Sequence, residues 1–207
     1  MLKTLIQSPD WMLRHADTAG VLLRRPEKQH SSMKPTLASF AILQAKPADP
    51  FLSPTRQADL YAAQATLLSL SGQMDMAEER LQQGLNVCPK HPLLNHNLGN
   101  QLMQKGENRA AYEHFNRALA TNPRLGGSAM NAGVCLMKLQ DFSGAEKMFR
   151  RTCQLQPENY QSWANHSLAL QQLGEYRKAL MSLEEAARLN PSNLQLKKAL
   201  TGLRQKL

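Results

Sequence analysis

The sequence predicts an all-α fold, a right-handed α-solenoid of helix-turn-helix repeats with a C-terminal capping helix. Aromatic residues make up only 5% of the chain, while leucine, alanine and glutamine recur throughout. This balance favours packed helices over the core of a sheet. The 207-residue chain also matches itself at an offset of 34 residues, as expected for stacked helix-turn-helix repeats.

Four consecutive repeats follow from this offset without an insertion. Together with the two end segments they give the ranges 1–57, 58–91, 92–125, 126–159, 160–193 and 194–207. In every repeat position 32 is proline, position 20 is alanine and position 11 is leucine: Pro89, Pro123, Pro157, Pro191; Ala77, Ala111, Ala145, Ala179; Leu68, Leu102, Leu136, Leu170. Four prolines at one position arise by chance about once in 10⁵ trials, so the repeat is genuine.

Each recurrent position has a mechanical reason. Alanine at position 20 is expected to face a small residue at position 8, so that the two helices of a repeat approach closely. Glycine at position 15 ends the first helix in the left-handed conformation, with Gln140 in its place in the third repeat. A large apolar residue at position 24 fills the space between repeats, and proline at position 32 stops the second helix.

This pattern resembles the tetratricopeptide repeat family over residues 58–193. The resemblance implies that the first helix of each repeat lines a concave surface, which holds an extended peptide segment of a partner protein. Carrying over the ligand-facing positions of the family gives His96, Asn97, Asn100, Met103, Met130, Asn131, Met137, Lys138, Gln161, Asn165, Leu168 and Gln172. We expect no cofactor, no metal and no small-molecule substrate.

Asparagine recurs at position 6 in three successive repeats, as Asn97, Asn131 and Asn165. A carboxamide has a donor and an acceptor, so it can hold one peptide unit by its N–H and C=O without regard to the ligand's side chains. The row is similar to the asparagine ladder in the repeats of O-GlcNAc transferase. Asparagine at this position also caps or bridges helices, and the sequence leaves both roles open.

Two other features of the ligand-facing positions qualify this picture. The cations with which some family members clamp an acidic C-terminus are missing, unless His96 is charged, so we expect no carboxylate clamp. The methionines suit a surface that accepts several apolar side chains, although methionine at helical spacing also forms core. At the start of the third repeat, Gly126-Gly127 is expected to fray the helix, with Ser128 as its cap.

The segments before and after the four repeats are predicted to have structure of their own. Residues 9–25 are predicted to form an amphipathic helix, and residues 26–52 a proline-rich linker with a short ordered patch. Three roles are open: a cap on the first repeat formed by residues 9–25 and 36–45, a docking helix for a partner or an anionic membrane surface, or a segment around Phe40 that occupies the protein's own groove. Residues 194–207 are predicted to be a helix whose leucines cover the fourth repeat.

The net charge of +9 is concentrated at the ends of the chain. Residues 1–57 have 8 basic and 4 acidic side chains, residues 58–193 have 13 and 12, and residues 194–207 have 4 and 0. The near-neutral body argues against nucleic acid as the ligand of the array. The basic ends leave contact with nucleic acid or an anionic surface as an alternative function.

No catalytic motif is present in the sequence, which therefore predicts a non-catalytic adaptor, with the regulatory subunit of a separate enzyme as a further alternative. His166 falls at a position usually held by leucine and is expected to be a core histidine with satisfied hydrogen bonds. Three cysteines without CxxC spacing predict reduced thiols, and no apolar run has secretory or membrane-spanning length. These features predict a cytoplasmic protein.

Overall fold

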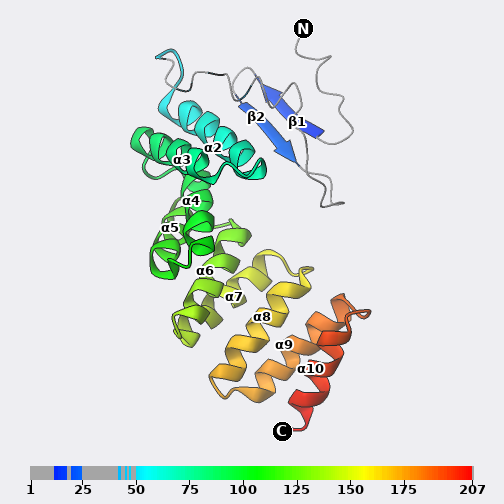
Figure 1. Cartoon of the computed structure of the whole chain (residues 1–207). Helices are drawn as coiled ribbons and strands as arrows, with labels where there is room; N and C mark the ends of the chain where they lie inside the picture. The colour runs from blue at the N-terminus through cyan, green and yellow to red at the C-terminus, as the bar shows by residue number, and fades with distance from the viewer. Residues whose placement is uncertain are drawn as a thin grey trace. The chain divides into compact units, whose positions relative to one another are not determined.

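The computed structural model describes residues 12–17, 20–24, 42, 45, 47 and 50–206. The chain divides into two compact units, Met1–Leu98 and Gly99–Leu207. Its helices are α2 (Pro54–Leu70), α3 (Met74–Val87), α4 (Pro92–Gln104), α5 (Asn108–Thr121), α6 (Gly126–Lys138), α7 (Phe142–Leu155), α8 (Tyr160–Gln172), α9 (Tyr176–Leu189) and α10 (Leu194–Arg204) (Figure 1). The predicted all-α solenoid of helix-turn-helix repeats is confirmed.

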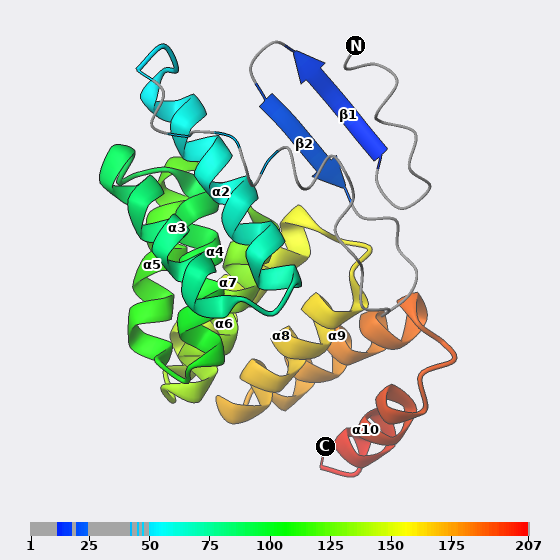
Figure 2. The ribbon, with the colours of Figure 1, turned by 45° about the horizontal axis from the view of Figure 1, so that its top comes forward.

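The bounds of the helices repeat as regularly as the sequence does. The first helices α4, α6 and α8 have 13 residues each, and the second helices α3, α5, α7 and α9 have 14. In the first compact unit α2 packs on α3; in the second, α6 packs on α7 and α8 on α9 (Figure 1, Figure 2). Successive pairs are joined where α5 packs on α6 and α7 on α8.

A left-handed residue ends the first helix of every repeat. Gly72, Gly106 and Gly174 have φ of 81°, 82° and 75°, as the sequence predicts for position 15. Gln140 takes the same conformation in the third repeat, with φ of 62°. A side chain with a Cβ is disfavoured in this region, so the third repeat retains a local strain that the others avoid.

The close approach of paired helices depends on two positions that vary together. A Cβ on Gly99 would lie 2.8 Å from the ring of Phe115, and one on Gly133 would lie 2.6 Å from the ring of Phe149. Where position 24 is the smaller leucine, position 8 has a side chain: Ala65 with Leu81, and Ser167 with Leu183. Position 8 therefore faces position 24 as well as position 20, whereas the sequence pattern indicated only position 20 as its neighbour.

Position 24 also connects neighbouring repeats, as predicted. Phe115 clusters with Ala132 and Cys135 of the next repeat, and Phe149 clusters with Ala169. Both rings are almost completely buried, with exposed fractions of 0% and 1%. The same side chain thus holds a helix pair together and stacks that pair on its neighbour.

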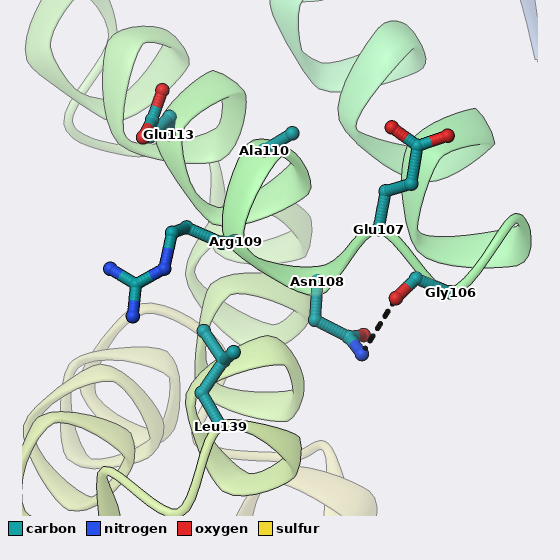
Figure 3. Close-up of a pocket in the computed structure, with 7 residues that line it drawn as sticks. All are labelled: Gly106, Glu107, Asn108, Arg109, Ala110, Glu113 and Leu139. Atoms are coloured by element: carbon teal, nitrogen blue, oxygen red, sulfur yellow. Dashed lines mark hydrogen bonds between the residues drawn. The ribbon is translucent and has the colours of Figure 1, made fainter.

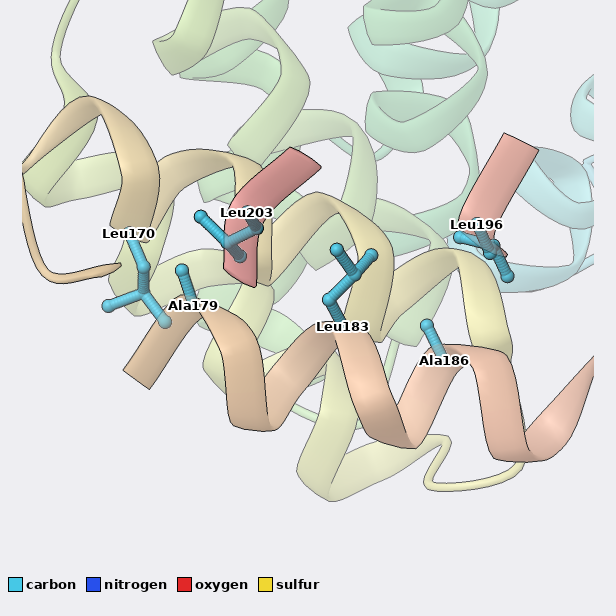
Figure 4. Close-up of a cluster of buried hydrophobic side chains, with 6 residues drawn as sticks. All are labelled: Leu170, Ala179, Leu183, Ala186, Leu196 and Leu203. Carbon is cyan, nitrogen blue, oxygen red and sulfur yellow. The ribbon is translucent and has the colours of Figure 1, made fainter. Parts of the chain in front are cut away.

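The C-terminal helix caps the array. Leu196 and Leu203 of α10 are buried against Leu170, Ala179, Leu183 and Ala186 (Figure 4). Asn193 caps the helix, because its side-chain oxygen accepts hydrogen bonds from the backbone N–H groups of Gln195 and Leu196. The capping role expected from the leucine spacing is confirmed.

The helix predicted for residues 9–25 is wrong. The structure has an antiparallel pair of strands there, β1 (Met12–Asp17) and β2 (Gly20–Arg24), with Leu13 opposite Leu23. A helix of this length is marginal by itself, and a glycine in its middle costs about 1 kcal/mol, so helical spacing alone was weak evidence. The docking helix proposed for this segment loses its basis.

A buried amide joins the proline-rich segment to the first repeat. Gln64 of α2 is 2% exposed, and its Nε2 donates hydrogen bonds to the carbonyl oxygens of Ile42 (2.9 Å) and Ala45 (3.0 Å). Ile42 and Pro47 are buried as well. These contacts favour the capping role for this stretch; Phe40 lies outside the described residues.

The late start of the third repeat's first helix, with Ser128 as its cap, is also wrong. Helix α6 begins at Gly126 itself, and Ser128 is a helical residue with 0% exposure. A Cβ on Gly126 would lie 2.8 Å from the end of the Gln156 side chain, which is exposed and can move aside. Fraying of the first turn of α6 stays a prediction.

Replacing Gln140 by glycine is expected to stabilise the protein by about 1 kcal/mol, because it removes the left-handed Cβ. The matched control is Gln82→Gly at an exposed position inside α3, which is expected to destabilise by about 1 kcal/mol. Urea unfolding of both variants measures the two effects. Equal destabilisation by both changes would show that Gln140 is unstrained.

Gly133→Ala and Phe149→Leu are each expected to cost about 1–3 kcal/mol, the first by overpacking and the second by leaving a void. The double variant recreates the pairing of Ala65 with Leu81 and is expected to cost less than the sum by at least about 1 kcal/mol. Denaturant unfolding of the four proteins in this cycle gives the coupling. Strict additivity would contradict the contact.

Candidate functional site

The row of asparagines lies where successive first helices meet. In the first compact unit the Nδ2 of Asn97 donates to Oγ1 of Thr66 on α2, at 3.2 Å. In the second, the Nδ2 of Asn131 donates to Oδ1 of Asn100 at 2.7 Å, and that of Asn165 contacts the sulfur of Met130 at 3.3 Å. Each amide therefore bridges two helices, one of the two roles that the sequence left open.

The bridges use only part of each amide. An asparagine side chain has two N–H donors and one oxygen acceptor. Among the described residues, Asn131 and Asn165 each use one donor, and no hydrogen bond reaches either side-chain oxygen. Both side chains are half-buried and keep some contact with solvent. Helix bridging is thus compatible with a second contact to a ligand.

The residues around the amides on α6 and α8 belong to the second compact unit, and we call them the α6–α8 face. On α6, Asn131, Val134 and Lys138 are three and seven residues apart and share one side of the helix. On α8 the same register gives Asn165, Leu168 and Gln172, preceded by Gln161. Lys138, Gln161, Leu168 and Gln172 are exposed, and Val134 is half-buried.

The predicted methionines contribute less to this surface than expected. Met103 packs partly buried against the cluster of Phe115, and Met130 and Met137 pack against the cluster of Phe149. Their thioethers mainly fill the interior between repeats. Leu168, with 46% of its surface exposed, is the large apolar side chain that this face presents to solvent.

The histidine next to Asn97 does not provide a cation. Burial lowers the pKa of His96 below its ordinary value, because removal from water disfavours the charged ring. The ring is therefore neutral at pH 7. Without a ligand, His96 therefore supplies no positive charge toward a carboxylate clamp.

His166 is a core histidine, as predicted. Its Nδ1 lies 3.0 Å from Oγ of Ser182, and its Nε2 lies 3.2 Å from Oε1 of Glu146. These residues border a cleft of 610 Å³ between α7, α8 and α9, which the sequence analysis did not find. The order serine, histidine, carboxylate is also that of hydrolytic triads; here Ser182 lies within α9 and is 5% exposed.

A second cleft, of 510 Å³, lies at the turn between α4 and α5 (Figure 3). The side-chain amide of Asn108 donates to the carbonyl oxygen of Gly106 at 3.0 Å and shapes the turn. Arg109 and Glu113 border the cleft with Leu139 of the next repeat.

The cysteines have packing roles. Cys135 and Cys153 are buried free thiols, and Cys88 is half-buried. Burial raises the pKa of Cys135, and it raises that of Cys153 to about 12, so neither forms a reactive thiolate near pH 7. In the part of the chain that the structure describes, no three acidic, histidine or cysteine side chains are grouped for a metal, and no helix is long and apolar enough to cross a bilayer.

Paired helices of constant length, stacked through position 24 and with their first helices linked by a repeated amide, define a helical-repeat protein of the helix-turn-helix class. Residues 96–160 and residues 160–193 each match a family model described as tetratricopeptide repeat. Residues 96–193 of the chain are therefore tetratricopeptide repeats. No curated protein is a significant match to it in sequence.

Solved structures share the fold. MamA from Desulfovibrio magneticus RS-1 superposes with a TM-score of 0.66 at 17% identity, covering 72% of this chain and 84% of MamA. A chain of the APC/C hetero-tetramer Cut9–Hcn1 superposes with a TM-score of 0.61 at 20% identity, and the match covers 72% of this chain and 32% of that one. The first tetratricopeptide repeat domain of Spaghetti (RPAP3), solved with the HSP90 peptide SRMEEVD, superposes with a TM-score of 0.53 at 18% identity. The match covers 56% of this chain and 91% of that domain.

The ring of His96 is expected to titrate below pH 6.5 in the folded protein. The unfolded state then binds a proton more readily, so His96 reduces stability as the pH falls below about 6.5 and has no such effect above it. A histidine NMR titration measures the midpoint directly. A midpoint above 6.5 would restore His96 as a cation beside Asn97.

Proposed function

We propose that this protein is a non-catalytic adaptor that binds an extended segment of a partner protein along the first helices of its repeats. Family membership supports the general role, since tetratricopeptide repeats are typically interaction modules. One related fold, that of RPAP3, is solved with a bound peptide. The compartment that we propose is the cytoplasm, where the three free thiols of Cys88, Cys135 and Cys153 stay reduced.

The observation that carries the proposal is the asparagine amide at position 6, of which the protein uses only one N–H donor. Asn131 and Asn165 each retain an N–H and an oxygen beyond their bridge to the preceding helix. An extended peptide offers one N–H and one C=O per residue, so a carboxamide can pair with both. The bridge to the neighbouring helix fixes the amide plane in advance, which reduces the entropy lost on binding.

The repetition of the amide sets what the site recognises. Two asparagines in the same position of successive repeats meet a ligand at two separate peptide groups. Because both contacts are made to the backbone, the contribution of the amides does not depend on the ligand's side chains. In the first compact unit Asn97 occupies the same position and makes the same type of bridge.

A random octapeptide library screened against the full chain provides the probe, and the strongest binder is then made with N-methyl groups at alternate backbone positions. N-methylation removes the backbone N–H groups that would donate hydrogen bonds to the asparagine side-chain oxygens. Calorimetry is therefore expected to show at least about a tenfold loss of affinity when either the odd or the even positions are methylated. This measurement needs no change in the protein. Full retention of affinity by both methylated forms would exclude a backbone clamp.

The double variant Asn131→Ala/Asn165→Ala is expected to lose about tenfold or more in affinity for the same peptide. Asn116→Ala, at an exposed position of α5, is the matched control and is expected to bind like the wild type. Circular dichroism melting separates loss of binding from loss of the helix bridges. Unchanged binding by the folded double variant would place the ligand elsewhere.

A further inference from the structure

Charge is distributed unequally between the two kinds of helix in the second compact unit. The first helices α6 and α8 have one charged side chain between them, Lys138. The second helices α7 and α9 have nine. Several of these pair with one another, as Arg188 does with Glu185 at 2.6 Å. Water solubility is therefore provided by the second helices, and the α6–α8 face is nearly free of charge.

The uncharged face is not simply polar. Leu168 lies three residues after Asn165 on α8, and Val134 lies three residues after Asn131 on α6. Each amide thus has an aliphatic neighbour on the same side of its helix. Val134 packs partly against the cluster of Phe149, so Leu168 is the main apolar side chain of the face and Val134 adds only its exposed part. Leu168 is 46% exposed. Contact of its apolar surface with water does not stabilise the protein, so this surface is available to a ligand.

This arrangement discriminates between ligand side chains by their charge. An aliphatic side chain that covers Leu168 and Val134 removes apolar surface from water on both partners. A charged side chain placed there loses its hydration without meeting an opposite charge. Lys138, at the end of the same row on α6, further disfavours a basic residue and accepts an acidic one.

We propose that the segment held by the α6–α8 face is an uncharged, aliphatic stretch of a partner protein without basic residues. The inference rests on the proposed function and specifies its ligand. The amides bind the backbone of the segment, and Leu168 with Val134 selects its side chains. Affinity then arises from apolar burial and neutral hydrogen bonds, so it is nearly independent of salt.

The experiment uses the full chain and three octapeptides of one length: alternating leucine and serine, the same with two leucines replaced by lysine, and the same with two replaced by glutamate. The leucine peptide is expected to bind at least about tenfold more tightly than the lysine peptide, with the glutamate peptide between them. The affinity for the leucine peptide is expected to change less than twofold between roughly 50 and 500 mM NaCl, a range in which the screening of charges increases strongly.

Leu168→Gln tests the selecting side chain and is expected to reduce binding of the leucine peptide about tenfold. Met181→Gln is the control, because Met181 is 70% exposed on α9, one of the charged helices, and is expected to leave binding unchanged. Equal loss in both variants would overturn the assignment to Leu168.

The outcomes separate the two proposals. Binding of none of the peptides, together with failure of the library screen, would reject the proposed function itself. Tightest binding by the lysine or glutamate peptide, or a tenfold dependence on salt, would reject only the aliphatic ligand. A self-association of the wild type that Leu168→Gln abolishes would identify a second copy of the chain as the occupant and would also overturn the inference.

Discussion

In the second and third repeats, a stretch of helix backbone without a side chain lies directly against an aromatic ring, Gly99 against Phe115 and Gly133 against Phe149. The glycine lets the two helices of the repeat approach, and the ring extends far enough to join the core of the following repeat. One contact thereby fixes both the distance within a pair and the stacking between pairs. The separation of successive first helices follows from it, and so does the 2.7 Å bridge between Asn131 and Asn100.

The array divides its two tasks between its two kinds of helix. The second helices carry the charges that keep the protein in water, together with the large residues of position 24. The first helices α6 and α8 have one charged side chain between them, and their small residues and leucines face inward. The low charge of the proposed binding face is thus offset by the charges on the other helices of the same repeats.

The sequence predicted the helices of the array well because their signals are chemical and repeated. Proline, glycine and alanine at fixed positions leave few alternatives, and Gln140 follows its repeat into the left-handed region against its own preference. Prediction failed where a pattern was local and single. Helical spacing over residues 9–25 competed with a strand pairing that no single window reveals. The pair Gly126-Gly127 indicated a late helix start, although α6 begins at Gly126.

The candidate site was predictable in its register and less so in its chemistry. Counting by 34 placed Asn97, Asn131 and Asn165 at one position of the repeat, but counting does not reveal that each amide already contacts the preceding first helix. Met103, Met130 and Met137 were assigned to the surface by register, whereas the structure turns much of each side chain inward. How a flexible thioether divides between surface and core depends on the volume of its neighbours, which the repeat pattern does not encode.

The buried amide of Gln64 has a consequence for how this array can grow. The equivalent position of the later repeats is Leu98, Ala132 or His166. Gln64 donates to the carbonyl oxygens of Ile42 and Ala45, and its own side-chain oxygen has no partner among the described residues. A buried amide that loses both acceptors is destabilising. A designed array in which another repeat stacks on α2 would therefore need an apolar residue in place of Gln64.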